Sequence, residues 1–180
     1  MLASIIIPTH NRYQILLKCL DAINRQTINL LDIEVIIIDD GSSDHTFAKI
    51  SRKKNSYNFK IICLKQANLG QGNARNLGLK HAHGNIIVFI GDDILLTPNF
   101  LEEHLHLHHL HPEISAGCLG LIEWHPDLKI TPFMNWLTNG SSIFGKFGGH
   151  QFAYEKLRNQ PLADYNFFYT SNISLKKSLL

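Results

Sequence analysis

Short runs of apolar residues, most of them β-branched, recur through the first hundred positions of the chain. They occupy residues 4–7, 34–38, 60–64 and 86–90. Both faces of each run are largely apolar, which is typical of parallel strands that are covered by helices on each side. The sequence therefore predicts four buried strands in a parallel sheet.

The segments between these runs have the periodicity of amphipathic helices. Ile15, Cys19 and Ile23 fall on one helix face and predict a helix through this stretch. Residues 43–50 begin with a Ser-Asp pair that is typical of an N-cap, and residues 72–81 lead into a His-Gly pair that is typical of a helix end. This order of strands and helices predicts an α/β domain with a doubly wound, mostly parallel sheet and helices on both faces.

The pattern is less regular beyond Pro98. A helix is predicted from this residue to about Leu110, followed by strands over residues 115–122 and 172–175. Between these strands, residues 124–170 are rich in aromatic residues and glycine and have no sustained periodicity. We expect a single domain, because 180 residues fall within the about 100–200 that one domain commonly has.

Composition and charge exclude several classes of protein. With 44% hydrophobic and 18% charged residues, the chain has the composition of a folded globular domain. Its formal net charge of +2 is too small for a protein that binds nucleic acid through a basic surface. The apolar runs are far shorter than the about 20 residues of a membrane-spanning helix, so no transmembrane segment is expected. The three cysteines are widely spaced and form no disulfide framework, which favours a cytoplasmic location.

Polar sequences follow each of the four predicted parallel strands. They are Pro-Thr-His-Asn-Arg at residues 8–12, Asp-Asp-Gly-Ser at 39–42, a Gly- and Asn-rich segment at 66–76, and Gly-Asp-Asp at 91–93. In an open α/β sheet, ligands bind outside the carboxyl ends of the strands. Each of these sequences alone is more typical of an ordinary turn or loop. Four of them at the same edge of a sheet predict a binding site.

Two of these sequences favour a metal-bound diphosphate as the ligand. The adjacent carboxylates of Asp92 and Asp93 follow an apolar strand, where like charges are unfavourable unless a cation neutralises them. Gly70 and Gly72 open a predicted helix that carries Arg75, and such a helix start suits phosphate groups. An exposed-helix role for Arg75 and a simple loop role for the glycines are the alternatives. The chain contains no P-loop sequence and lacks the complete glycine pattern of a dinucleotide-binding turn.

Taken together and in this order, five segments resemble the inverting glycosyltransferases of family 2, which have the nucleotide-sugar-binding GT-A fold. The segments are residues 4–12, 35–44, 68–78, 89–94 and, more weakly, 169–177. The resemblance implies a nucleoside-diphosphate sugar as donor and transfer of its sugar, with inversion, to an acceptor hydroxyl. The acceptor is left open as a saccharide, a lipid-linked molecule or a protein. Mg²⁺ or Mn²⁺ is implied as the cofactor.

The resemblance also implies roles for individual residues. The positions that it places along the nucleotide-sugar donor are Pro8, Thr9, Asn11, Arg12, Asp40, Arg75 and Asp92. Among these, Asp40 is implied to accept a hydrogen bond from the base, Arg75 to lie by the base or the diphosphate, and Asp92 to face the ribose. Asp93 is implied to bind the metal ion. The chain departs from the common D-x-D form of this motif, because Gly91 stands at its first position.

The end of the chain differs from what the resemblance implies for a complete enzyme. In the family, a carboxylate that acts as the general base follows the segment that matches residues 172–177, whereas only Ser-Leu-Leu follows it here. The upstream Glu155 and Asp164 match no such motif. We therefore expect a chain that is truncated at its C-terminus. Residues 1–122 would form the donor-binding region, and residues 123–180 an incomplete acceptor-side region of the same domain.

Two other functions are open at this point. A non-catalytic remnant that lacks the general base would at most bind nucleotide, and a nucleotidyltransferase with a related sheet would use triphosphate donors. Because many members of the family act on lipid-linked acceptors, a peripheral position at the inner face of a membrane is also open. No basic amphipathic helix indicates such a position.

Five histidines lie close together in residues 104–111. His104, His108 and His111 would share one face of the predicted helix, which invites a metal-binding interpretation. No cysteine joins them, and the leucines of the same helix mark its expected buried stripe. We therefore expect an exposed histidine face that binds no metal.

Overall fold

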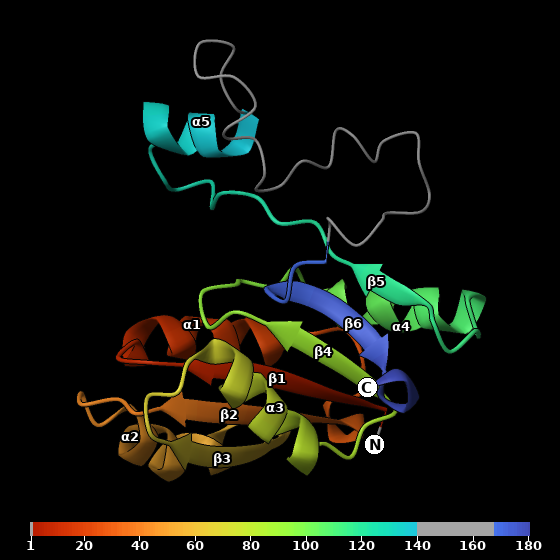
Figure 1. The fold of residues 1–180 in the computed structure, drawn as a ribbon, viewed down its shortest axis with the longest axis horizontal. Helices are drawn as coiled ribbons and strands as arrows, with labels where there is room; N and C mark the ends of the chain where they lie inside the picture. Colours follow the sequence, from red (N-terminus) through yellow and green to blue (C-terminus); the bar gives the residue numbers. More distant parts are fainter. Residues whose placement is uncertain (1, 140–167) are drawn as a thin grey trace. The chain divides into compact units, whose positions relative to one another are not determined.

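The computed structural model describes residues 2–139 and 168–180 (Figure 1). Its described part contains one six-stranded sheet with strand order β3-β2-β1-β4-β6-β5. The strands are β1 (Ala3–Thr9), β2 (Ile33–Asp40), β3 (Lys60–Gln66), β4 (Ile86–Ile90), β5 (Gly117–Leu119) and β6 (Asn172–Lys176). Strands β1 to β4 run parallel, whereas β6 is antiparallel to both of its neighbours, β4 and β5. The expected α/β fold with a mostly parallel sheet is confirmed, and the antiparallel pairs lie at one side of it.

Helices cover both faces of this sheet. The described α-helices are α1 (Tyr13–Ile23), α2 (Thr46–Lys53), α3 (Gln71–His81), α4 (Phe100–Leu110) and α5 (Pro132–Asn139), and the short 3-10 helices are η1 (Leu30–Asp32), η2 (Lys54–Ser56) and η5 (Lys177–Leu179). Helix α3 packs on one face, the near one in Figure 1, whereas α1, α2 and α4 contribute side chains to the core on the other face. None of the described helices is both long and apolar enough to cross a membrane.

Alternation along the strands divides the apolar side chains between two cores. On β1, Ile5 and Ile7 belong to the core on the α1 face, whereas Ile6 belongs to the core beneath α3, and all three are fully buried. This division explains why the parallel strands are apolar on both faces. Gly78 allows α3 to approach the sheet closely, because a Cβ at this position would lie 2.7 Å from Cγ2 of Ile6.

Two element boundaries differ from the expected ones. The helix expected from residue 43 begins at Thr46, because His45 has a left-handed backbone with a φ of 62°. Asp44 still helps to start this helix, since its Oδ1 accepts a hydrogen bond from the amide of Thr46 at 3.0 Å. The strand expected over residues 115–122 is limited to Gly117–Leu119, the three residues that pair with β6.

The expected exposed histidine face of α4 is wrong for two of its members. His104 and His108 are 3% and 6% exposed, whereas Leu110 is 60% exposed. Nδ1 of His104 and Nε2 of His108 lie 2.8 Å and 2.9 Å from Oγ of Ser174 on β6. Helix α4 therefore packs on a polar position of the sheet, where two histidines take a place that we expected leucine to fill.

The chain divides into two compact units. The first comprises Met1–Leu119 and Tyr169–Leu180 and contains the sheet, and the second comprises Gly120–Phe168. Within the described portion of the second unit, the rings of Phe133 and Trp136 on α5 stack with centroids 5.7 Å apart.

Candidate functional site

The loops that follow β1 and β2 are joined by the side chain of Asn11. Its Oδ1 accepts hydrogen bonds from the backbone amides of Ser43 (2.8 Å) and Asp44 (3.2 Å), and the backbone amide of Asn11 donates to Oγ of Ser42 at 2.9 Å. Asn11 has a φ of 53°, a left-handed conformation that Asn adopts more readily than most residues. These bonds hold the two loops side by side at the carboxyl edge of the sheet.

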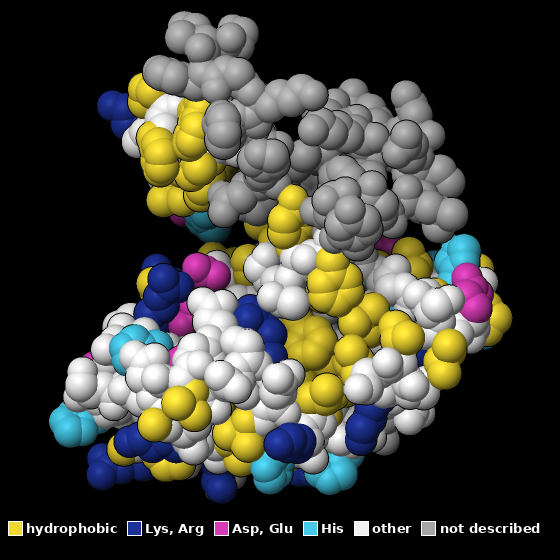
Figure 2. Space-filling model, viewed as in Figure 1, with side chains coloured by type: hydrophobic (Ala, Val, Ile, Leu, Met, Phe, Trp, Pro, Cys, Tyr) yellow, Lys and Arg dark blue, Asp and Glu magenta, His cyan; other side chains and the backbone are white. Residues whose placement is uncertain are grey.

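Asp92 and Asp93 follow β4 at the same edge. Oγ1 of Thr9 donates a hydrogen bond to Oδ2 of Asp92 (2.7 Å), and Nη1 of Arg12 lies 3.1 Å from both Oδ1 of Asp92 and Oδ2 of Asp93. The Asp92 side chain is 7% exposed, against 54% for Asp93. Figure 2 shows magenta and dark-blue side chains next to one another at the left of the view, on the side where the parallel strands end in Figure 1. One buried and one exposed carboxylate thus share a single guanidinium group.

The groups of this cluster influence each other's ionisation. Burial raises the pKa of Asp92, although the hydrogen bond from Thr9 and the charge of Arg12 act in the opposite direction. The charge of Asp92 in turn raises the pKa of Arg12. The buried carboxylate of Asp92 therefore relies on nearby positive charge to stay ionised.

Asp40 holds the loop between β3 and α3. Its Oδ1 accepts hydrogen bonds from Nε2 of Gln66 (2.7 Å) and the amide of Leu69 (2.9 Å), and its Oδ2 accepts one from the amide of Gly70 (3.0 Å). Burial alone would raise the pKa of Asp40, but these hydrogen bonds outweigh it, and the pKa lies below its ordinary value. The neighbouring Asp39 differs, because its buried Oδ2 has no hydrogen-bond partner among the described residues.

Arg75 lies on α3, directly after the loop that Asp40 holds. It is half-buried, and its Nη1 donates a hydrogen bond to Oε1 of Gln71 at 3.2 Å. Its buried Nε has no hydrogen-bond partner in the described part of the chain, and burial lowers its pKa. A partly buried guanidinium group with an unpaired nitrogen is suited to an anionic ligand.

The expected site residues contribute in different ways. One connected cluster is formed by Thr9, Arg12, Asp92 and Asp93. Of the other expected residues, Asn11 and Asp40 bond to loops, and Arg75 bonds to a residue of its own helix. Pro8 is a buried residue of β1 in register with a residue of β2, so its ring shapes the strand end and offers no hydrogen bond.

Several residues that contribute to this edge were not singled out from the sequence. They are His10, Asp39, Ser42, Ser43 and Gln66. His10 is an example, since its Nδ1 lies 2.7 Å from the carbonyl oxygen of Asp40 and links the first loop to the second. All of them stand beside or within the polar sequences that follow the strands, and this position is the signal that could have identified them.

Asp92 and Asp93 offer oxygen ligands of the kind that Mg²⁺ and Mn²⁺ prefer. One oxygen of each lies 3.1 Å from Nη1 of Arg12, so both oxygens already converge on one cationic group. Within residues 2–139 and 168–180, no group of three or more His, Cys, Asp or Glu side chains is arranged to hold a metal ion. The pair therefore fits an ion that takes its other ligands from water and a bound phosphate.

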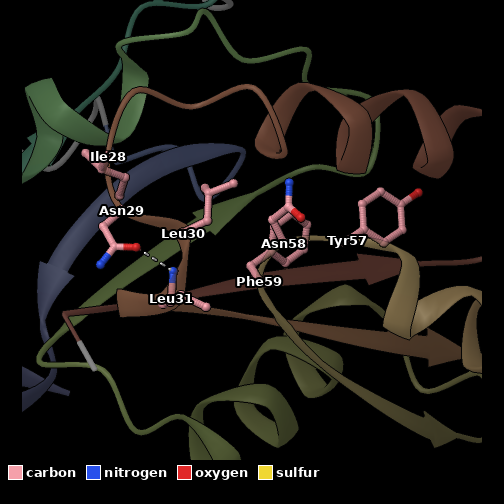
Figure 3. A pocket seen from close by; sticks show the side chains of 7 residues that line it. All are labelled: Ile28, Asn29, Leu30, Leu31, Tyr57, Asn58 and Phe59. Carbon is pink, nitrogen blue, oxygen red and sulfur yellow. Dashed lines mark hydrogen bonds between the residues drawn. The ribbon is translucent and has the colours of Figure 1, made fainter.

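A separate hollow of about 580 Å³ lies at the other edge of the sheet (Figure 3). It is lined by Ile28, Asn29, Leu30, Leu31, Tyr57, Asn58 and Phe59. These residues precede β2 and β3 in the chain, so the hollow lies at the amino ends of these strands. None of the charged groups described above lines it, and the candidate site is therefore distinct from this hollow.

Comparison with known proteins gives a consistent picture. The sequence model described as "Glycosyl transferase family 2" matches residues 4–169. The poly(ribitol-phosphate) beta-N-acetylglucosaminyltransferase TarS of Staphylococcus aureus is 29% identical over 100 residues, which are 56% of this chain and 18% of TarS. The uncharacterized glycosyltransferase EpsJ of Bacillus subtilis is 37% identical over 100 residues, which are 55% of this chain and 28% of EpsJ. The matched residues thus cover less than a third of the length of either relative.

Solved structures share the same fold. A crystal structure of S. aureus TarS 1–349 in complex with UDP-GlcNAc has a TM-score of 0.61 and 24% identity, and the match covers 73% of this chain and 37% of that one. The mannosyltransferase PcManGT from Pyrobaculum calidifontis, in complex with GDP-Man and Mn²⁺, has a TM-score of 0.60 and 22% identity. That match covers 68% of this chain and 35% of the mannosyltransferase.

Proposed function

Because the chain belongs to glycosyl transferase family 2, we propose that it binds a nucleoside-diphosphate sugar and transfers the sugar, with inversion, to an acceptor hydroxyl. The observation that carries this proposal is the meeting of polar loops at the carboxyl edge of the sheet, where Arg12 joins Asp92 and Asp93. The solved structures of similar fold that are in complex with UDP-GlcNAc or GDP-Man support a nucleotide-sugar donor.

The ribose and diphosphate of the donor are assigned to the cluster at the ends of β1 and β4 and to α3. Asp92 faces the ribose, and the hydrogen bond from Thr9 keeps its carboxylate in one orientation. The guanidinium groups of Arg12 and Arg75 attract the diphosphate. Pro8 closes the end of β1 beneath the nucleotide. The Nε of Arg75, which is buried without a hydrogen-bond partner among the described residues, supports this assignment.

The base of the donor is assigned to the loops that Asn11 and Asp40 hold. The two carboxylate oxygens of Asp40 provide about four acceptor positions, and hydrogen bonds from Gln66, Leu69 and Gly70 use three of them. The position left on Oδ2 can accept an N–H group of the base. Asn11 acts indirectly, because it fixes the loop after β2. We propose that this loop contacts the nucleotide.

Asp93, together with Asp92, is proposed to hold Mg²⁺ or Mn²⁺. When bound, such an ion neutralises negative charge on the diphosphate as it leaves the sugar. The convergence of one oxygen from each carboxylate on Nη1 of Arg12 supports this assignment.

Inverting transfer is a direct displacement. The acceptor oxygen bonds to the anomeric carbon as the bond from that carbon to the diphosphate breaks, the diphosphate takes the electron pair, and a carboxylate base takes the hydroxyl proton. We propose that residues 1–122 form the donor side and that the acceptor side lies within residues 123–180, apart from β6, which pairs with the sheet. Glu155 and Asp164, the carboxylates considered for the base, lie outside the described residues. The acceptor is proposed to be a saccharide, a lipid-linked molecule or a protein.

The free thiols of all three cysteines support a cytoplasmic location for this reaction. Attachment to the inner face of a membrane would accompany a lipid-linked acceptor.

Titration with nucleotides tests the proposal. We expect UDP or GDP to bind in the presence of Mn²⁺ and Asp93→Ala to weaken this binding about tenfold or more, because a metal ligand is lost. Isothermal titration calorimetry with UDP, GDP and CTP, each with and without Mn²⁺, measures both effects. Asp32→Ala is the matched control, since Asp32 lies at the opposite edge of the sheet.

Other results of this titration would contradict the proposed donor site or favour a different function. Diphosphate binding that is absent or independent of Mn²⁺ would contradict the proposed donor site. Preference for CTP over both diphosphates would favour a nucleotidyltransferase. Metal-dependent binding of a donor sugar without turnover on any acceptor would favour a chain that binds the nucleotide and lacks a general base.

A further inference from the structure

Arg12 stands between the two carboxylates that follow β4. Its Nη1 lies 3.1 Å from Oδ1 of Asp92 and 3.1 Å from Oδ2 of Asp93. Like charges so close together are unfavourable, and the guanidinium group lowers that cost. A divalent ion held by the same two oxygens would stand beside this guanidinium group, and two cations in contact repel each other. The ion and Arg12 therefore compete for the same oxygens.

The members of this cluster are not held equally firmly. Asp92 is 7% exposed and receives a hydrogen bond from Thr9. The backbone of Arg12 is fixed at the start of α1, where its carbonyl oxygen accepts hydrogen bonds from the amides of Ile15 (3.1 Å) and Leu16 (3.0 Å). The Arg12 side chain, in contrast, is 50% exposed, and its Nη1 pairs with Asp92 and Asp93 from this exposed position. The guanidinium group can therefore leave while the backbone and the buried carboxylate stay in place.

We propose that Arg12 is a resident counter-cation of Asp92 and Asp93, which the metal ion displaces, and that the displaced guanidinium group then binds the phosphates of the donor. This inference rests on the proposed donor site. In the free protein, Arg12 weakens the binding of the metal ion alone. When a diphosphate is present, the displaced guanidinium group gains a new anionic partner. Metal ion and nucleotide therefore bind cooperatively, because each favours the displaced position of Arg12.

The experiment measures the coupling between Mn²⁺ and UDP. The affinities for Mn²⁺ alone, for UDP alone and for each in the presence of the other are measured by Mn²⁺ electron paramagnetic resonance and by calorimetry. We expect Arg12→Gln to bind Mn²⁺ alone roughly three- to tenfold more tightly, and the coupling factor to fall by about tenfold. Arg52→Gln removes the same charge from an exposed position on α2 and is the matched control.

The coupling factor separates displacement from simple repulsion. If Arg12 stayed in place and only repelled the ion, Arg12→Gln would change the separate affinities for Mn²⁺ and UDP but would leave the coupling factor unchanged. That result would overturn the inference. Arg12→Lys is a second variant that keeps the charge and loses the planar donor group, so we expect its coupling factor to lie between those of the wild type and Arg12→Gln. Far-UV circular dichroism checks that each variant is folded.

A structural measurement gives an independent readout. In a crystal structure with Mn²⁺ and UDP, we expect the guanidinium group of Arg12 to have left Asp93 and to contact a phosphate oxygen. If wild-type protein binds neither UDP nor GDP together with Mn²⁺, the proposed function fails and this inference fails with it. If wild-type protein binds Mn²⁺–UDP and Arg12 still bridges the two carboxylates, only this inference fails.

Discussion

Two adjacent aspartates at the end of β2 have different surroundings. Asp40 accepts three hydrogen bonds that fix the loop before α3, whereas Oδ2 of Asp39 is buried without a hydrogen-bond partner in the described part of the chain. A buried acceptor without a partner is unfavourable by about 1–3 kcal/mol. An N–H group that reached Asp39 would relieve this cost. The two carboxylates are identical in the sequence, and only the direction of the backbone at the strand end separates their roles.

Asp40→Asn tests the role of this carboxylate in holding the loop. The side-chain amide keeps one acceptor oxygen and turns an NH₂ group toward a backbone donor, so a hydrogen bond from Leu69 or Gly70 is lost. We expect the free energy of unfolding to fall by about 1–3 kcal/mol and UDP to bind more weakly. Urea denaturation and calorimetry measure the two effects, with Asp32→Asn as the control. Unchanged stability would contradict the assigned role.

The lowered pKa of Asp40 adds a pH dependence to this prediction. The native state holds the ionised carboxylate more favourably than the unfolded state does. The resulting stabilisation is complete above the unfolded pKa and is lost as the pH falls through the lower folded pKa. Asp40→Asn should lack this part of the acid sensitivity of the wild type.

At the scale of elements, α4 is attached to the sheet through a polar contact. His104 and His108 approach the same hydroxyl group of Ser174 on β6. Burial and the neighbouring His108 lower the pKa of His104 to about 4. Burial and the charge of Lys176 lower the pKa of His108. Both imidazoles are therefore neutral near pH 7, and the contact depends on that neutrality.

The pH dependence of unfolding tests this contact. His104 binds a proton in the unfolded state below about pH 6.5 and in the folded state only below about pH 4, so stability should fall between these values as the pH is lowered. We expect His104→Gln to reduce the slope of the unfolding free energy against pH by up to about 1.4 kcal/mol per pH unit. Denaturation at about pH 4.5 to 7, which covers most of the range between the two pKa values, measures this slope. His106→Gln changes an exposed histidine of the same helix and is the control. An equal effect of both variants would contradict the assignment.

Some features of the helices and strands could be predicted from the sequence, and others could not. The four parallel strands were predictable because short, largely β-branched apolar runs are typical of strands in a parallel sheet, and the strand over residues 86–90 was predicted with the bounds of β4. The buried face of α4 was not predictable, because its periodicity cannot reveal that β6 presents Ser174 to it. The same limit applies to the site. Motifs identified Arg12 and the two aspartates that follow β4 separately, but the ion pairs between them depend on two loops that meet only in the folded chain.

At the scale of the whole molecule, β6 completes the sheet from a distant part of the chain. It lies between β4 and β5, and its Ile173 and Leu175 are each 4% exposed in the core beneath α3. The amide of Gly91 also donates a hydrogen bond to the carbonyl oxygen of Ser171 at 3.2 Å. The segment that leads into β6 therefore fixes the residue directly before Asp92.

A fragment of residues 1–122 tests how much the sheet depends on β6. Without this strand, the edge of β4 loses its hydrogen-bond partners and part of the core is exposed, so we expect the fragment to aggregate or to melt more than about 10 °C below the full chain. Thermal unfolding followed by circular dichroism and size-exclusion chromatography measures both outcomes. A chain that ends at Lys176 keeps all of β6 and is the control. A fragment 1–122 as stable as this control would show that β6 is dispensable.

The pairing of β6 also determines where the chain leaves the sheet and returns to it. Because β6 is antiparallel to both β4 and β5, the end of β5 at Leu119 and the start of β6 at Asn172 lie at the same edge, where β4 finishes. Residues 120–168 are therefore an insertion between two paired strands. Each doubling of the length of such an insertion costs only about 0.6 kcal/mol in loop closure, and the register of the sheet does not change. Under the proposed function, evolution could exchange this insertion, and with it the acceptor, while the donor site is inherited intact.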